Sequence, residues 1–186
     1  MLQTLLFFHL LAVVGLFSGM AVEVFAIVQL QRAATNADVR AALLNLPTVG
    51  PIMGLSTLLL LAMGIAMIYV GGFGWSAGWI NVVFALTIVL AILGPAVTGR
   101  RAEALHALAA KAGEGPIASD IDAGRRDRVL AYMVFLGIFE LIAALYIMVA
   151  KPDLTPAIVF AVAAAIVAGL PAALLMRRTQ TARAET

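Results

Sequence analysis

Residues 133–145, MVFLGIFELIAAL, place twelve uncharged side chains around a single carboxylate, that of Glu140. They form the centre of an apolar run at 128–149, and about 20 apolar residues suffice for a helix to cross the ~30 Å hydrocarbon core of a bilayer. Four further runs of this kind occur, at 3–30, 50–71, 77–98 and 155–176. The sequence therefore predicts an all-α transmembrane bundle of five spans, forming a single membrane domain over residues 1–186.

The composition is that of a protein embedded in lipid. Of the 186 residues, 63% are hydrophobic and 12% are charged, whereas soluble domains average about 45–50% and about 25%. The net charge is only +2 and no basic helix face accompanies it, so we expect the lipid bilayer, and no nucleic acid, as a partner. The absence of cysteine excludes disulfides and Cys-ligated metal centres.

The distribution of basic residues predicts the orientation. The connections 31–49 and 99–127, the adjoining Arg128 and the C-terminal tail contain eleven of the twelve Lys and Arg residues, and the opposite side has only Lys151. Because cytoplasmic loops are enriched in Lys and Arg, we expect an outside N-terminus, a cytoplasmic C-terminus and a location in the inner (plasma) membrane. Aromatic residues that favour a membrane interface should mark the outer end: Tyr69, Trp75, Trp79 and Tyr146.

Both cytoplasmic connections contain helix signals. In the first, Asn36 or Asp38 is a candidate cap for a small surface helix. The second extends the third span as a helix that ends near Gly113, and Ser119 is a candidate cap for the next helical turn. For the long connection, 99–127, we favour a solvated loop as the interpretation, with a docking surface for a soluble partner as the alternative.

Polar side chains within the spans are the candidate functional residues. A charged group near the bilayer centre costs at least about 2.5–3.5 kcal/mol, and the spans contain no Lys or Arg to pair with a carboxylate. Desolvation disfavours the charged form, so such a carboxyl tends to take up a proton. This favours proton or cation handling; the alternative is a protonated carboxyl that only bonds neighbouring helices. The candidates are His9, Glu23, Ser56, Thr57, Thr87 and Glu140.

Helical spacing places His9 and Glu23 on one face of the first span. Fourteen residues separate them, which is close to whole turns and about 21 Å along the axis. They therefore mark two ends of a polar path, or His9 is an interfacial histidine bonded to a carbonyl or a lipid headgroup. The same stripe contains four apolar residues: Val13, Leu16, Met20 and Ile27.

Depth along the spans suggests partners for the glutamates. Ser56 and Thr57 enter the second span at about the depth of Glu23, and Thr87 lies near the middle of the third span, level with Glu140. These hydroxyls are therefore candidates for a shared polar site.

Two pairs of glycines have a spacing that permits close helix contact. Gly15 and Gly19 form one pair in the first span, and Gly50 and Gly54 form another at the start of the second. Small residues four apart let two helices approach closely, within a chain or between chains.

Two segments carry a resemblance to a known group of proteins. The run FFHLLAVVGLFSGM at 7–20 and the run LGPAVTGRRAEAL at 93–105 resemble the small bacterial integral membrane proteins related to the copper-resistance protein D group. The resemblance implies a helical bundle, and it implies that His9 is a possible metal contact.

These observations lead to two function hypotheses. The first is a small membrane transport component, coupled to protons or a cation through Glu23 and Glu140. The alternative is a non-catalytic accessory or assembly subunit, in a homo-oligomer or a larger membrane complex, whose glutamates pair with basic residues of a partner. We expect neither an enzyme nor a bound cofactor, because no HExxH, GxSxG, Walker A or GxGxxG motif occurs in a usable context.

Overall fold

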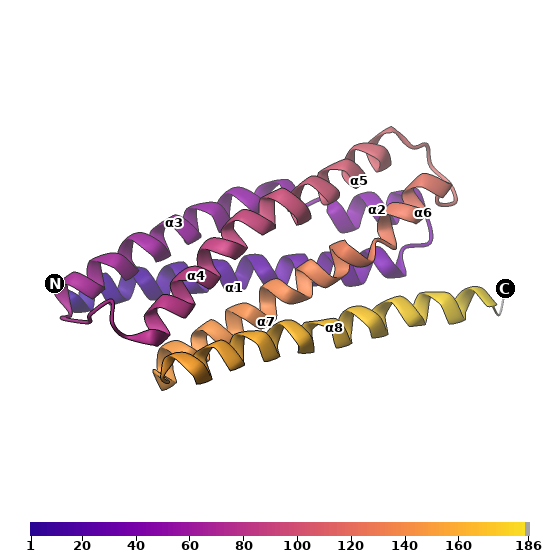
Figure 1. Cartoon of the computed structure of the whole chain (residues 1–186). Helices are drawn as coiled ribbons and strands as arrows, with labels where there is room; N and C mark the ends of the chain where they lie inside the picture. The colour runs from indigo at the N-terminus through magenta and orange to yellow at the C-terminus, as the bar shows by residue number, and fades with distance from the viewer. Residues whose placement is uncertain (185–186) are drawn as a thin grey trace.

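The computed structural model of the chain describes residues 1–184, with side chains up to Met176. It is all-helical, as predicted, and the described residues contain no β-strand. Long helices run the length of the molecule and short ones gather at one end (Figure 1). The long helices are α1 (Leu2–Arg32), α3 (Leu46–Val70), α4 (Gly78–Leu93), α7 (Arg128–Ala150) and α8 (Leu154–Ala184); the short ones are α2 (Asn36–Leu43), α5 (Arg100–Lys111) and α6 (Ser119–Arg125), and the π-helical η1 (Gly94–Gly99) joins α4 to α5.

Five helical segments of the described chain are long and apolar enough to cross a membrane, which confirms the predicted number. The span predicted at 128–149 is α7, and the one predicted at 77–98 is α4 with most of η1. The second span starts earlier than predicted, at Leu46, because Pro47 stands in the first turn of α3, where its missing N–H leaves no backbone partner unsatisfied.

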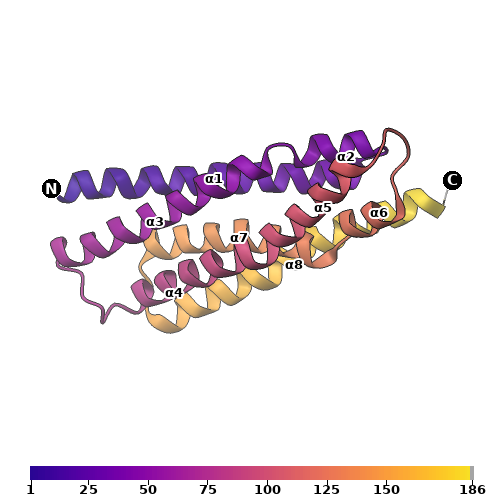
Figure 2. The same cartoon turned by 90° about the horizontal axis from the view of Figure 1, so that it is seen from above.

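The bundle has two ends, which we name by their composition (Figures 1 and 2). The aromatic end holds the N-terminus, the loop 71–77 and the turn 151–153. There Lys151 has φ 48°, and its Nζ lies 5.3 Å from the ring centre of Phe73 and 5.9 Å from that of Trp79. The basic end holds α2, α5, α6 and the C-terminal part of α8.

The contacts between the long helices define the bundle. α1 contacts α3 and α7, while α7 also contacts α8 and α4. Gly15 and Gly19 of α1 leave room for Ser56 and Met53 of α3, so this predicted glycine pair mediates a close helix contact. A Cβ added at Gly50 or Gly54 meets nothing within 4 Å; this second pair lies on an open face of α3.

The basic end is a folded layer. Its core combines residues of four short or terminal segments that are almost fully buried. The connection 99–127 is therefore packed against α2 and the end of α1, and the interpretation as a solvated loop is wrong. Each short helix places its apolar residues on one face, and these faces meet the end of α1 to form the core. The core residues are Leu30, Val39, Leu43, Leu105, Ala109 and Ile121.

Two predicted caps differ from those observed. Thr35 caps α2, and Asp38 occupies the third helical position of the same capping box, in which each side chain bonds the other residue's backbone N–H. Ser119 is the first residue of α6, and its side chain forms no cap. A cap that the sequence analysis missed is Asp127, whose carboxylate accepts from the N–H groups of Val129 and Leu130 at the start of α7.

Candidate functional site

Glu140 lies at the centre of the bundle. It is the thirteenth of the 23 residues of α7, about 18 Å from the start of that helix. Only 4% of its surface is exposed, and Oε2 is buried without a hydrogen-bond partner. Its neighbour Leu141 packs against the α1–α3 cluster, and Ala144, one turn further, belongs to a cluster with Val83 of α4. The carboxyl group is therefore enclosed by apolar helices and faces no cation among the described residues.

Glu23 is half-buried on α1 and lies closer to the basic end. A contact between α1 and α7 fixes its level relative to Glu140: a Cβ at Gly137 would be 2.7 Å from Met20 Sδ. The helices run in opposite directions (Figure 2). Glu23 lies three residues from Met20 toward the basic end, and Glu140 lies three residues from Gly137 toward the aromatic end. The two carboxylates are thus offset by roughly 9 Å along the axis, with the Met20–Gly137 contact between them.

His9 joins α1 to α3. It is buried, and its Nδ1 lies 3.2 Å from the carbonyl oxygen of Leu60. A Cβ at Gly64 would be 3.6 Å from the imidazole Cε1, so the absence of a side chain there admits the ring. The structure therefore supports the interpretation of a histidine bonded to a carbonyl. The stripe predicted between His9 and Glu23 is buried as well: Val13, Leu16, Met20 and Ile27.

Thr87 and Glu140 flank a shared cluster of α4 and α7. Val83 and Ala144 belong to this cluster, and Thr87 and Glu140 each lie four residues from them, toward the basic end. The Thr87 hydroxyl donates to the Val83 carbonyl at 2.8 Å. Among residues 1–176 it forms no hydrogen bond with Glu140.

Ser56 and Thr57 do not lie at the depth of Glu23. Ser56 fits against Gly15, which is eight residues from Glu23, or about 12 Å along α1. The Thr57 hydroxyl donates to the Met53 carbonyl of its own helix at 2.9 Å. The predicted depth is wrong because α2 folds back along the end of α1, so that α3 starts beside α1 and well short of its last turn (Figure 1).

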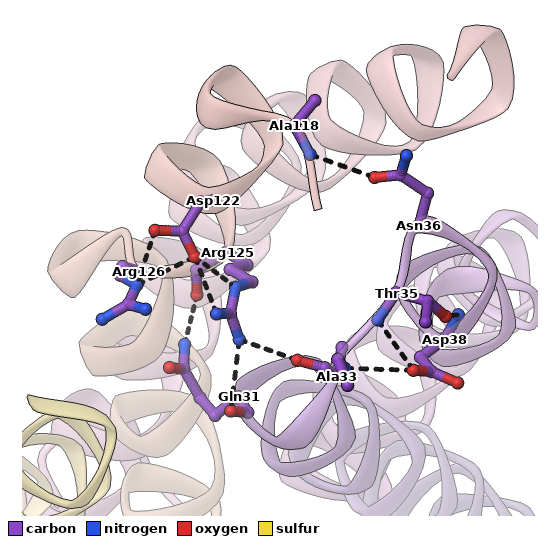
Figure 3. A network of polar contacts seen from close by, with 10 residues as sticks. Gln31, Ala33, Thr35, Asn36, Asp38, Ala118, Asp122, Arg125 and Arg126 are labelled. Carbon is purple, nitrogen blue, oxygen red and sulfur yellow. Dashed lines mark hydrogen bonds and ion pairs between the residues drawn. The ribbon is translucent and has the colours of Figure 1, made fainter. Parts of the chain in front are cut away.

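The second buried charge of the described chain, Arg125, has a full set of partners at the basic end (Figure 3). Its Nη1 donates to the carbonyls of Gln31 and Ala33 at 3.3 and 3.2 Å, and its Nε donates to Asp122 at 2.7 Å. The Gln31 amide returns a hydrogen bond to the Arg125 carbonyl. This network joins α6 to the last turn of α1 and satisfies carbonyls that the helix end leaves free.

Asp122 is the carboxylate of this network, on α6 and outside the membrane-spanning segments. Burial raises the pKa of Asp122, but hydrogen bonds from Arg126 and Arg125 lower it more, and the pKa lies below its ordinary value. The sequence analysis missed this network. Its signal was the spacing of Asp122 to Arg125 and Arg126, three and four residues apart on one helix face.

The chemistry available in the spans is that of isolated carboxyl groups. In the part of the chain with described side chains, no three His, Asp or Glu residues converge on a position for a metal ion. His9 contributes a single imidazole, whose Nδ1 faces the Leu60 carbonyl. The carboxyls of Glu140 and Glu23 can bind and release a proton or contact a cation, without a second acidic group beside them.

A family model of predicted integral membrane proteins, DUF2269, matches residues 3–152. The chain belongs to this DUF2269 family. The match extends from α1 to the turn before α8 and therefore includes both glutamates, His9 and the Arg125 network. No curated protein and no solved structure matches the chain significantly. The family supports an integral membrane protein in contact with lipid, and the comparisons show no link to the copper-resistance protein D group.

Proposed function

We propose that this DUF2269 protein is a small transport component of the inner (plasma) membrane that binds and releases a proton or a cation at Glu140. The observation that carries the proposal is the buried Oε2 atom of Glu140, which has no hydrogen-bond partner in the described structure. A carboxyl group in this position destabilises the fold and is expensive to insert into lipid. Its presence is explained if the function requires a titratable group there.

The position of Glu23 supports a route from the basic end. Glu23 is half-buried and lies nearer the basic end than Glu140. A proton that enters at this end meets Glu23 first and then the Met20–Gly137 contact. Methionine has a flexible, unbranched side chain, and rotation of Met20 is the step that we propose connects the two carboxyls.

Flux measurements on reconstituted protein test this proposal. Vesicles containing a trapped pH-sensitive dye are given a potassium diffusion potential, and proton entry is followed in wild type and Glu140→Gln. Glutamine keeps hydrogen-bonding capacity but cannot titrate, so we expect the flux to fall by about a hundredfold or more. A parallel series with a sodium gradient distinguishes a cation from a proton.

The matched control is Glu103→Gln, because Glu103 is an exposed carboxylate of α5 outside the spans. We expect wild-type flux from this variant and a partial loss from Glu23→Gln. The proposal is refuted if Glu140→Gln conducts as wild type does, or if wild type conducts no better than empty vesicles under any gradient.

A second candidate function is that of a non-catalytic accessory or assembly subunit. The open face of α3 favours it, since Gly50 and Gly54 leave space that a helix of another chain can approach. Burial of Glu140 within its own chain argues against a partner's cation reaching it, whereas half-buried Glu23 is accessible to one. Native mass spectrometry of the protein extracted from its own membrane is the test: a stoichiometric foreign subunit favours this function, and a monomer or homo-oligomer favours transport.

A further inference from the structure

A groove runs between the last turns of α1 and the short helix α2, with a volume of about 370 Å³. One wall uses α1 residues spaced four and three apart, including Phe25, Gln29 and Arg32. The other uses Asp38, Ala41 and Asn45 with a similar spacing. Each spacing keeps its residues on one helix face, so the groove follows the axes of both helices.

The polarity of the groove changes along its length. α1 and α2 form an antiparallel hairpin (Figures 1 and 2), which places Arg32 and Asp38 toward the tip and Phe25 toward the spans. With 31 residues, α1 is about 46 Å long, which exceeds the ~30 Å hydrocarbon core. The hairpin therefore reaches into the headgroup layer, with its charged part on the water side and its apolar part on the hydrocarbon side.

The side chains of the groove are available for a ligand. Phe25 is 64% exposed. Arg32 is exposed and forms no hydrogen bond or ion pair within the described residues, even though it lines the same groove as Asp38. Backbone hydrogen bonds from Ala34 (3.0 Å) and Thr35 (2.9 Å) hold the pKa of Asp38 below its ordinary value, and the carboxylate is therefore charged at neutral pH. A cation and an anion thus share one groove without neutralising each other.

We propose that this groove binds one molecule of phosphatidylethanolamine from the adjoining leaflet. Arg32 contacts the phosphate, Asp38 accepts hydrogen bonds from the primary ammonium group, and one acyl chain lies along Phe25. A zwitterionic headgroup with N–H donors matches both charges. Phosphatidylcholine lacks those donors, and a purely anionic headgroup places a second negative charge beside Asp38. This inference is independent of the role of Glu140.

Native mass spectrometry on delipidated protein tests the proposal. The protein is titrated with phosphatidylethanolamine, its N-monomethyl derivative and phosphatidylcholine, all with the same acyl chains, and the bound fraction is compared. We expect retention to fall along this series, and Asp38→Asn to abolish the preference, because asparagine keeps an acceptor for the α2 cap but loses the charge. We expect Arg32→Gln to weaken binding of all three lipids by about fivefold.

Matched controls remove the same charges elsewhere at the basic end. Arg100→Gln and Glu103→Gln change exposed residues that do not line the groove, and both should bind as wild type does. Ala41→Phe fills the groove without touching the cap and should abolish retention of the lipid. Equal retention of phosphatidylethanolamine and phosphatidylcholine by wild type would overturn the proposal. A preference that persists in Asp38→Asn and Ala41→Phe, or stronger retention of phosphatidylglycerol in a parallel titration, would overturn it as well.

Discussion

Arg125 and Glu140 are both buried charged residues, with 8% and 4% exposure, but their surroundings differ completely. Arg125, at the basic end, donates to two carbonyls of α1 and pairs with Asp122. Glu140, in the spans, has an oxygen that nothing in the described structure satisfies. Removing one partner of a buried charged network is strongly destabilising, whereas a buried carboxyl oxygen without a partner is itself destabilising. The first is thus a structural residue, and the second needs a functional reason.

The largest effect that we expect is on the paired charge. Arg125→Ala leaves the carbonyls of Gln31 and Ala33 without this donor and leaves Asp122 with Arg126 alone, and should lower the free energy of unfolding by about 3–5 kcal/mol. Denaturant unfolding in detergent measures this change, with Arg100→Ala as the control for an exposed arginine. If the two variants lose equally little stability, the basic end is not held by this network and the comparison fails.

Replacing Glu140 should change the free energy of unfolding in the opposite direction. Glu140→Met removes a buried polar group that has no partner and should raise the free energy of unfolding by about 1–3 kcal/mol, in the same assay. Glu103→Met, at an exposed position of α5, should change it little. A clear loss of stability in Glu140→Met would mean that Glu140 has a partner in the membrane, and would remove the observation on which the proposed function depends.

The smallest effect that we expect is a pH dependence of stability that comes from Asp122, the carboxylate paired with Arg125. The pKa of Asp122 is lower in the folded protein than its ordinary value, so its contribution to stability is present above that ordinary value. It is lost as pH falls from about 4 through the lower, folded pKa. Unfolding measured at pH 6 and pH 3 should show a larger decrease for wild type than for Asp122→Asn. Equal decreases would show that Asp122 is not linked to folding.

Sequence patterns predicted the spans and the helices of the connections, but not how those short helices pack. α7 begins and ends within one residue of its predicted bounds, because a bilayer of fixed thickness demands a long apolar run whatever surrounds it. The prediction for 99–127 failed because Leu105, Ala109 and Ile121 show their role only when α2 supplies the facing side of the core. Short amphipathic helices do not reveal their partners in a single sequence.

The surroundings of the candidate residues depend on how the helices align. Thr87 and Glu140 each lie one turn from a cluster that contains Val83 of α4 and Ala144 of α7. Ser56 lies far from the level of Glu23 because the hairpin of α1 and α2 shifts α3 along α1. A depth counted from the end of a span is correct only where the adjoining connection adds no such shift.

The sequence by itself determined the membrane class, the number of spans and the carboxyl groups that are costly in lipid, because hydrophobicity and length act locally along the chain. Only the tertiary structure decided that His9 meets the Leu60 carbonyl, that Arg125 is paired and that Glu140 is not. It also decided that Glu23 and Glu140 are separated by the Met20–Gly137 contact. These contacts depend on how helices distant in sequence align, and that alignment is set by the packing of many side chains at once.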